Sequence, residues 1–186
     1  DPFWFGTRLK KVPLPSGEHL LYEVPLTPEE YLFPHEDDHV VLHPEHIENQ
    51  FYLYSVLQVR AGFVPGRRVF ADCRIDFQVE GMEALGPDVI LIDAPEFQFP
   101  RDSATLYVRD RRATILFVIE ITSPSTRPMD LYGKPPLLFR AGVPQLVIVD
   151  CESGGGPADG ALLSYLTGPN GYVVQPLQNN RVLLHG

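Results

Sequence analysis

A strand-like apolar run that contains a glutamate constrains the fold of this chain most strongly. Residues 114–122 read Thr-Ile-Leu-Phe-Val-Ile-Glu-Ile-Thr, a short and nearly continuous apolar run that is rich in β-branched residues. Such a run is typical of a strand covered on both faces, as in a central parallel or mixed sheet. A carboxylate there is costly unless a partner compensates for its burial. Glu120 therefore predicts a specific partner at the end of this strand.

The segments around this strand predict an α/β domain. A roughly helical apolar pattern runs from His43 to about Arg60, and Thr27-Pro28-Glu29-Glu30 has the form of a helix start with a capping box. Short apolar runs predict strands at 68–71, 74–77, 89–92, 105–108 and 145–150, and a short helix is expected within 124–142. The tail has the pattern of a three-stranded β-meander over ALLSYL, YVVQPL and RVLLHG. This order favours a mixed central β-sheet flanked by helices.

Length and charge set the expected organisation. The 186 residues suffice for one domain with a core, and we expect residues 1–42 to be an N-terminal extension and residues 43–186 a single domain. The net charge of −9 counts against a protein that coats nucleic acid. However, residues 1–50 hold ten acidic and three basic residues, whereas residues 60–140 hold eleven of each. The stretch around Glu120 is therefore locally neutral.

The sequence predicts a cytoplasmic protein without a membrane anchor. No apolar run approaches the roughly 18 residues that a membrane helix needs, and the opening stretch lacks the pattern of a secretory signal. Cys73 and Cys151 are the two cysteines of the chain, and they form no C-x-x-C motif. This cysteine usage favours a reducing compartment over a disulfide scaffold.

Asp88 is the first candidate for joint action with Glu120. Gly86-Pro87-Asp88 leads directly into the predicted strand 89–92, and on its own this is the pattern of a turn. If this strand neighbours the strand that contains Glu120, the two carboxylates meet at one end of the sheet. Two carboxylates, a backbone carbonyl and waters make a typical Mg²⁺ site. We therefore expect the partner of Glu120 to be a metal ion.

Several motifs along the chain resemble those of the Uma2 (DUF820) family. The string PD at 87–88 precedes IEITSPST at 119–126, DLYGK at 130–134, AGVP at 141–144 and IVD at 148–150. The resemblance runs from about Glu45 to Tyr172, and that family belongs to the PD-(D/E)XK nuclease superfamily. It implies a restriction-endonuclease-like core that uses Mg²⁺ or Mn²⁺, with Asp88, Glu120 and the Ile121 carbonyl as metal ligands. It also implies DNA as the substrate.

The chain departs from the superfamily pattern at the lysine. Thr122 stands where the superfamily has a lysine two residues after the glutamate, and the Uma2 pattern offers Lys134 in the next helix instead. A lysine there would activate water and offset phosphate charge. Pro135 follows directly, and a residue before proline is pushed out of the α region, so we expect Lys134 at the helix entrance. The alternative is a surface lysine paired with Asp130.

Histidines near the predicted long helix offer a different metal hypothesis. His35, His39, His43 and His46 are spaced by four, four and three residues, which suggests zinc. Pro44 interrupts any continuous helix through this row, and surface or capping roles are favoured. His46 or Glu48 can still border the predicted carboxylate site.

The leading hypothesis is a metal-dependent endonuclease in which Asp88, Glu120 and Lys134 are catalytic and DNA phosphodiester bonds are hydrolysed. The alternative is a binding or assembly module on a catalytically decayed nuclease core, which Thr122, the prolines after Lys134 and the net charge favour. Pairing of Glu120 with a protein cation such as Lys134, in place of metal, would favour this alternative. A weaker third hypothesis is hydrolysis of another phosphoester. Homodimerisation is a further expectation, by analogy with nucleases that cut two strands.

Overall fold

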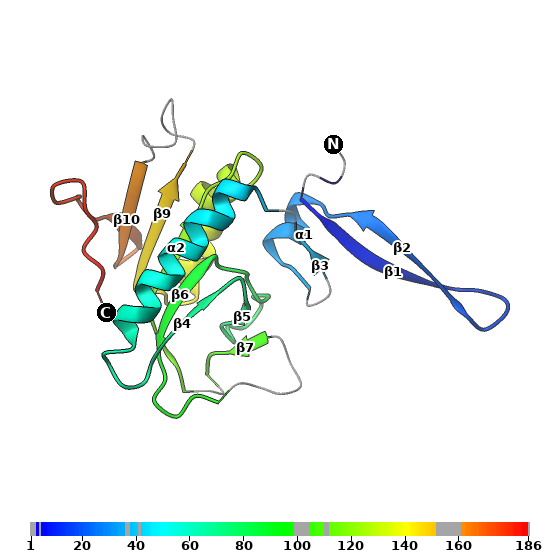
Figure 1. Ribbon diagram of the computed structural model, residues 1–186, viewed down its shortest axis with the longest axis horizontal. Helices are drawn as coiled ribbons and strands as arrows, with labels where there is room; N and C mark the ends of the chain where they lie inside the picture. Colours follow the sequence, from blue (N-terminus) through cyan, green and yellow to red (C-terminus); the bar gives the residue numbers. More distant parts are fainter. Residues whose placement is uncertain are drawn as a thin grey trace.

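A six-stranded mixed sheet forms the centre of the structure, with the strand order β11-β10-β9-β8-β6-β4 (Figure 1). The computed structural model describes residues 3, 5–35, 38–40, 42–98, 105–109, 112–151 and 161–185. The strands of the sheet are β4 (Arg67–Ala71), β6 (Val89–Asp93), β8 (Thr114–Ile121), β9 (Gln145–Asp150), β10 (Ala161–Gly168) and β11 (Gly171–Val174). β8 and β9 are parallel, and the other neighbouring pairs are antiparallel. The prediction of an α/β fold with a mixed sheet is confirmed.

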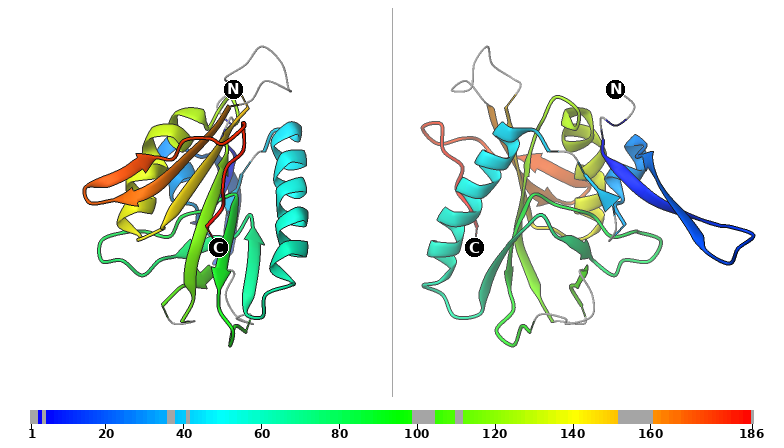
Figure 2. Two further views of the ribbon diagram at one scale, coloured as in Figure 1. Left: turned by 90° about the vertical axis from the view of Figure 1, so that its left-hand side faces the viewer. Right: turned by 45° about the vertical axis from the view of Figure 1, so that its right-hand side comes forward.

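Helical segments lie on both faces of this sheet, with α2 (Pro44–Ala61) on one and the π-helix η1 (Met129–Gly133) and α3 (Lys134–Arg140) on the other (Figure 2). The short helix α1 (Pro28–Leu32) lies beside the N-terminal strands (Figure 1). The α2 helix packs on the face where Val69, Leu91 and Phe117 are buried. On the opposite face, Leu138 of α3 belongs to the larger core cluster together with Ile90 and Ile148. The central strands are therefore covered on both sides, as their apolar sequences predict.

Two smaller sheets complete the described part of the chain. β5 (Arg74–Asp76) pairs in parallel with β7 (Thr105–Tyr107). β1 (Thr7–Pro13), β2 (His19–Pro25) and β3 (Asp38–His39) form a separate sheet in the order β2-β1-β3. The β1–β2 hairpin projects from the rest of the molecule as an arm (Figure 1). Every residue of the arm from position 9 to position 23 is exposed.

Local sequence signals account for most of these elements. Thr27 caps α1: its hydroxyl accepts from the Glu30 N–H while the Glu30 carboxylate accepts from the Thr27 N–H, so the predicted capping box is confirmed. The long helix and the short helix also form where they are predicted. No helix in the described ranges has the length and apolar character to cross a membrane.

The predicted third strand of the C-terminal meander is wrong. Arg181 makes only an isolated bridge to Gln178, and the residues after it form no strand. The buried amide of Gln145 holds this tail instead, because its Nε2 donates to the Leu183 carbonyl at 2.8 Å and its Oε1 accepts from the His185 N–H at 2.8 Å. A side chain from β9 thus replaces the backbone ladder of a third strand.

Candidate functional site

The register of β6 and β8 brings the two predicted carboxylates to one end of the sheet. The strands are antiparallel neighbours, and Val89 pairs with Ile119. The beginning of β6 therefore lies beside the end of β8. Asp88 Oδ2 accepts a 2.6 Å hydrogen bond from the backbone N–H of Ile121, the residue that follows Glu120. Both carboxyl-bearing residues are buried, and Glu120 has no exposed surface.

The partner of Glu120 is Lys134. Lys134 Nζ lies 2.6 Å from Glu120 Oε2 and 2.9 Å from Asp130 Oδ1, and its side chain is only 4% exposed. The pairing with Asp130 is thus present, but the interpretation of Lys134 as a surface lysine is wrong. The other carboxylate oxygen of Glu120, Oε1, is buried and has no hydrogen-bond partner in the described part of the chain.

A helical junction aims Lys134 at the end of β8. The π-helix η1 runs directly into α3, and the Lys134 N–H donates to the carbonyl of Met129, five residues earlier. Lys134 begins α3 as predicted, but its φ of −70° and ψ of −38° are helical, so the expectation that Pro135 pushes it out of the α region is wrong. That conformation is disfavoured before proline but allowed. The two ion pairs at Nζ stabilise it.

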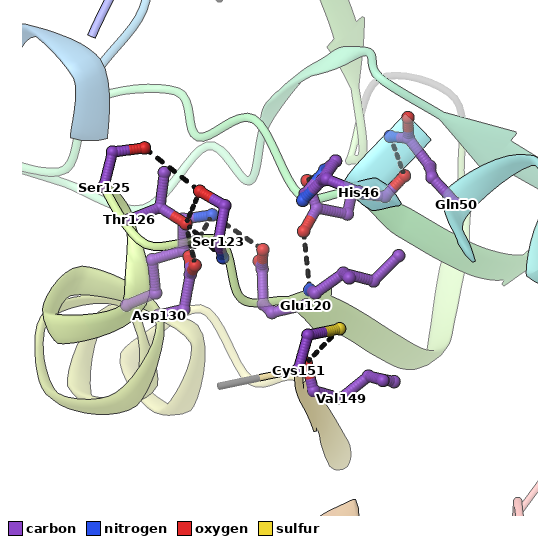
Figure 3. Close-up of polar contacts among 12 residues, drawn as sticks. His46, Gln50, Glu120, Ser123, Ser125, Thr126, Asp130, Val149 and Cys151 are labelled. Atoms are coloured by element: carbon purple, nitrogen blue, oxygen red, sulfur yellow. Dashed lines mark hydrogen bonds and ion pairs between the residues drawn. The ribbon is translucent and has the colours of Figure 1, made fainter. Parts of the chain in front are cut away.

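Asp130 is fixed by the turn that precedes η1. Thr126 Oγ1 donates to Asp130 Oδ2 at 2.5 Å and accepts from the Ser123 N–H at 3.1 Å. In Figure 3 the side chain of Glu120 lies between those of Asp130 and His46. Ser123 and Thr126 therefore act as turn and capping groups, and they orient one of the two carboxylates that hold Lys134.

The α2 helix contributes two buried polar residues that contact Asp88. His46 Nε2 lies 3.2 Å from Asp88 Oδ1, and Gln50 Nε2 donates to the Asp88 carbonyl at 2.9 Å. The two residues are one helical turn apart, so both face the same end of the sheet. Of the two candidates on this helix, His46 borders the site and Glu48 is exposed. Sequence reasoning missed Gln50, and the signal that could have identified it is its i, i+4 spacing from His46.

Burial and mutual charge shift the ionisation of this cluster. Burial raises the pKa of Glu120 well above its usual range, and the Lys134 cation offsets only part of this effect. Burial likewise raises the pKa of Asp130. Burial opposes ionisation of Asp88 too, but the His46 contact and the Lys134 charge outweigh it, so the pKa of Asp88 is lowered. For Lys134, burial is outweighed by Asp130, Glu120 and Asp88, which together hold its pKa well above the usual value.

Thr122 serves a different purpose from the lysine that the superfamily pattern has there. Its Oγ1 donates to Asp150 Oδ1 at 3.0 Å and accepts from the Cys151 N–H at 2.9 Å. Arg127 completes this arrangement with two 2.9 Å hydrogen bonds to the Asp150 carboxylate. Thr122 therefore joins the ends of β8 and β9, and the cation that contacts Glu120 comes from α3. Sequence reasoning singled out neither Asp150 nor Arg127 as polar partners.

The carboxyl groups of the cluster are of the ligand type that Mg²⁺ prefers. Asp88, Glu120 and Asp130 place three carboxyl groups around Lys134 and His46. Burial disfavours the charged form of His46, but its contact with Asp88 outweighs this effect and raises the pKa of His46. The unpartnered Glu120 Oε1 is a buried acceptor at this position. Mg²⁺ is commonly held by one or two carboxylates, with water and substrate phosphate completing its shell. Within the described ranges no group of three or more His, Cys, Asp and Glu side chains is arranged to hold a metal ion, either in the histidine row or in the carboxylate cluster.

Comparisons with known proteins place the chain in context. The Uma2 family model, described as "putative restriction endonuclease", matches residues 38–185. A crystal structure of a "putative nuclease belonging to DUF820" from Anabaena variabilis has a similar fold, with a TM-score of 0.56 and 15% identity. That match covers 84% of this chain and 91% of the other. No curated protein sequence matches this chain at a significant level.

Proposed function

Because this chain belongs to the Uma2 family, we propose that it is a metal-dependent endonuclease that hydrolyses phosphodiester bonds in DNA. The observation that carries this proposal is the buried cluster at the junction of β6, β8 and α3. There, Asp88 lies beside Glu120 at the adjoining ends of β6 and β8, and Glu120 Oε1 is buried without a hydrogen-bond partner among the described residues. A protein interior tolerates such an arrangement when a cation completes it.

The proposed roles follow from the contacts. Asp88, Glu120 and the Ile121 carbonyl would hold Mg²⁺ or Mn²⁺. When bound, such an ion polarises the scissile phosphate and lowers the pKa of an attacking water. Lys134 would present its ammonium to the phosphate and to the water, where it offsets the negative charge that develops in the transition state. His46 holds one oxygen of Asp88, and the Ile121 N–H holds the other, so the carboxylate is fixed in orientation.

The experiment that tests this proposal is plasmid nicking in Mg²⁺ or Mn²⁺ by Asp88→Asn and Glu120→Gln variants. We expect each variant to lose activity about 100-fold or more, because each removes a charge that acts in the transition state. Asp72→Asn is the matched control, since Asp72 is an exposed aspartate close to Asp88 in space, where its N–H donates to the Asp88 carbonyl at 3.2 Å, and its φ of 49° suits asparagine. Equal nicking by all three variants, or none by the unaltered protein, would contradict the proposal.

A binding or assembly module is the second candidate. The 2.6 Å pairing of Lys134 with Glu120 favours it, because a protein cation already compensates one oxygen of the buried carboxylate. Measurement of Mn²⁺ binding separates the two candidates. An anomalous signal within ligand distance of Asp88 and Glu120 in an Mn²⁺-soaked crystal supports the nuclease. Absence of that signal, with the ion pair retained, supports the module.

The remaining expectations about organisation stay predictions. We propose that residues 1–42 form an extension to a single domain of residues 43–186. The family match supports this division only roughly, since it begins at residue 38. Cytoplasmic localisation and homodimerisation also stay predictions, and neither the family match nor the fold match supports a homodimer.

A further inference from the structure

A groove runs between α2 and the edge strand β4. It has a volume of about 680 Å³, and its lining includes Phe51, Tyr54, Arg67, Arg68 and Phe70. A smaller hollow of about 220 Å³ lies against it and shares Arg67. β4 is the last strand of the six-stranded sheet, so the groove follows an outer edge of the molecule. Figure 2 shows α2 lying alongside this edge.

The charge of this groove is opposite to that of the whole chain. The two hollows are lined by Arg60, Arg67 and Arg68, and their described lining has no acidic side chain. The net charge of the chain is −9, with 24 acidic residues. For comparison, the hollow of about 370 Å³ beside α1 is lined by three aspartates, Asp38, Asp72 and Asp88. The groove is therefore locally suited to a polyanion.

The arginines of the groove are available to a ligand. Arg68 is exposed, and its described hydrogen bond runs from Nη1 to the carbonyl of its neighbour Arg67. Arg67 Nε is buried and has no hydrogen-bond partner in the described ranges. A buried guanidinium nitrogen without a partner is costly, and an anionic oxygen in the groove would satisfy it.

The aromatic rings of the groove add a second kind of contact. Phe51 is 70% exposed although it lies on the groove side of α2, next to the buried Gln50. Tyr54 follows one turn later, and it is only partly buried. Rings exposed beside arginines are the combination that binds single-stranded nucleic acids, because unpaired bases stack on the rings while the cations contact the phosphates.

Both walls of the groove begin at the candidate site. On the helix side, Gln50, the residue before Phe51, donates to the Asp88 carbonyl at 2.9 Å. On the strand side, Asp72, the residue after Ala71 of β4, donates its N–H to the same carbonyl at 3.2 Å. One end of the groove therefore lies near the Asp88 backbone, while Asp88 itself lines the hollow beside α1.

We propose that the α2–β4 groove binds a single-stranded stretch of DNA and leads it to the carboxylate cluster. Phe51 and Tyr54 stack with bases, and Arg67 and Arg68 contact phosphates. In a duplex the base faces are covered by stacking, so these rings discriminate in favour of unpaired DNA. This inference rests on the proposed nuclease function only in one respect, namely that the bound strand is then cleaved. The binding itself is independent of cleavage.

The test is the affinity of the full chain for a fluorescent oligodeoxythymidylate of about 12 nucleotides, measured by anisotropy in EDTA so that no cleavage occurs. We expect tighter binding to this oligonucleotide than to a duplex of the same length. Phe51→Ala should weaken binding about tenfold through the loss of one stacked base. Arg68→Ala should lower the slope of log affinity against log salt concentration by about 0.7, the effect of one lost phosphate contact on a single strand.

Two matched controls accompany these variants. Tyr52→Ala removes a ring that is 65% exposed on the same helix but does not line the groove. Arg181→Ala removes an exposed arginine outside both hollows. We expect both controls to bind like the unaltered chain. All four side chains are exposed, so the variants should fold. Arg68→Ala also removes one hydrogen bond, to the carbonyl of Arg67.

The outcomes separate this inference from the proposed function. Binding that depends on Phe51 and Arg68 supports the groove even where plasmid nicking is absent. The inference is overturned if the chain does not bind the oligonucleotide, if the duplex binds at least as tightly, or if Phe51→Ala and Arg68→Ala bind as tightly as their controls. If plasmid nicking persists in that case, the proposed nuclease function is still supported, and only the inference about the groove is wrong.

Discussion

Glu120 is fully buried, yet only one of its two carboxylate oxygens has a partner in the described structure. The ion pair with Lys134 explains how the strand tolerates this carboxylate. Lys134 also contacts Asp130, so one cation serves two buried carboxyl groups. It offsets only part of the effect of burial, which raises the pKa of Glu120.

At this scale we predict that Lys134→Met destabilises the protein by about 3–5 kcal/mol, because it leaves two buried carboxylates without their cation. The double variant Glu120→Gln/Lys134→Met should recover part of this loss, since it removes one of the stranded charges. Urea unfolding followed by circular dichroism measures both free energies. A Lys134→Met variant as stable as the unaltered chain would show that water, and not Lys134, compensates the carboxylates.

The sequence predicted those parts of the candidate site that depend on a single strand or on a short motif. The carboxylate in an apolar strand made Glu120 a candidate, and Asp88 became one on the condition that its strand neighbours that of Glu120, which it does. The pairing of Asp130 with Lys134 was predicted only as part of the alternative, for a lysine on the surface. The burial of Lys134 was not predictable, because it depends on how η1 and α3 pack against β8. The network of Thr122, Asp150 and Arg127 also escaped prediction, since it joins side chains up to 28 positions apart.

Among the elements, the β1–β2 arm contributes least to the packed structure. Its residues from position 9 to position 23 are exposed, including several large apolar side chains such as Leu20 and Leu21. A two-stranded hairpin is only marginally stable by itself. The base of the arm is better held, because Arg8 makes hydrogen bonds of 2.6 and 2.7 Å to Asp38 and one of 2.9 Å to Glu30.

We therefore predict that replacing residues 10–22 with Asn-Gly, a favoured two-residue hairpin turn, changes the free energy of unfolding by less than about 1 kcal/mol. Arg8→Ala at the base should cost about 2 kcal/mol, because it strips the fully buried Asp38 side chain of its cation. Thermal unfolding of both variants provides the comparison. A large loss on shortening the arm would mean that its apolar residues are packed in solution.

Helices and strands were predicted correctly where the local sequence pattern favours the same structure as the packing around it. The capping box of α1, the long α2 and the buried strands β6, β8 and β9 each carry their signal in a few neighbouring residues. The failed strand in the tail has a suitable apolar run, RVLLHG, but no neighbouring strand accepts it. The Leu183 carbonyl and the His185 N–H bond to the side chain of Gln145 instead. A side-chain partner of this kind produces no periodic pattern in the sequence, so it could not be predicted.

For the whole molecule, the central question is how the N-terminal segment relates to the site. β1, β2 and β3 form a sheet of their own, apart from the six-stranded sheet. Tyr31 of α1 is nevertheless buried, and it lines a hollow together with Asp88. Its burial raises the pKa of its hydroxyl far above the usual value. The N-terminal strands thus form their own sheet, whereas Tyr31 of α1 lines the same hollow as Asp88.

We predict that a chain of residues 43–186 still unfolds cooperatively but is less stable by about 3 kcal/mol. The loss reflects the removal of Leu26 and Tyr31, two buried side chains of the segment. Urea denaturation monitored by circular dichroism compares this chain with the full one. A broad transition without cooperativity would show that the extension and the domain fold as one unit.

The π-helix η1 makes the alignment of Lys134 sensitive to the number of residues before it. A π turn holds one residue more than an α-helical turn. Each residue rotates a helix by about 100°, so deletion of one position from η1, such as the exposed Tyr132, turns the ammonium of Lys134 away from Glu120. A substitution at the exposed Tyr132 keeps the number of residues in η1, so it should leave that direction unchanged.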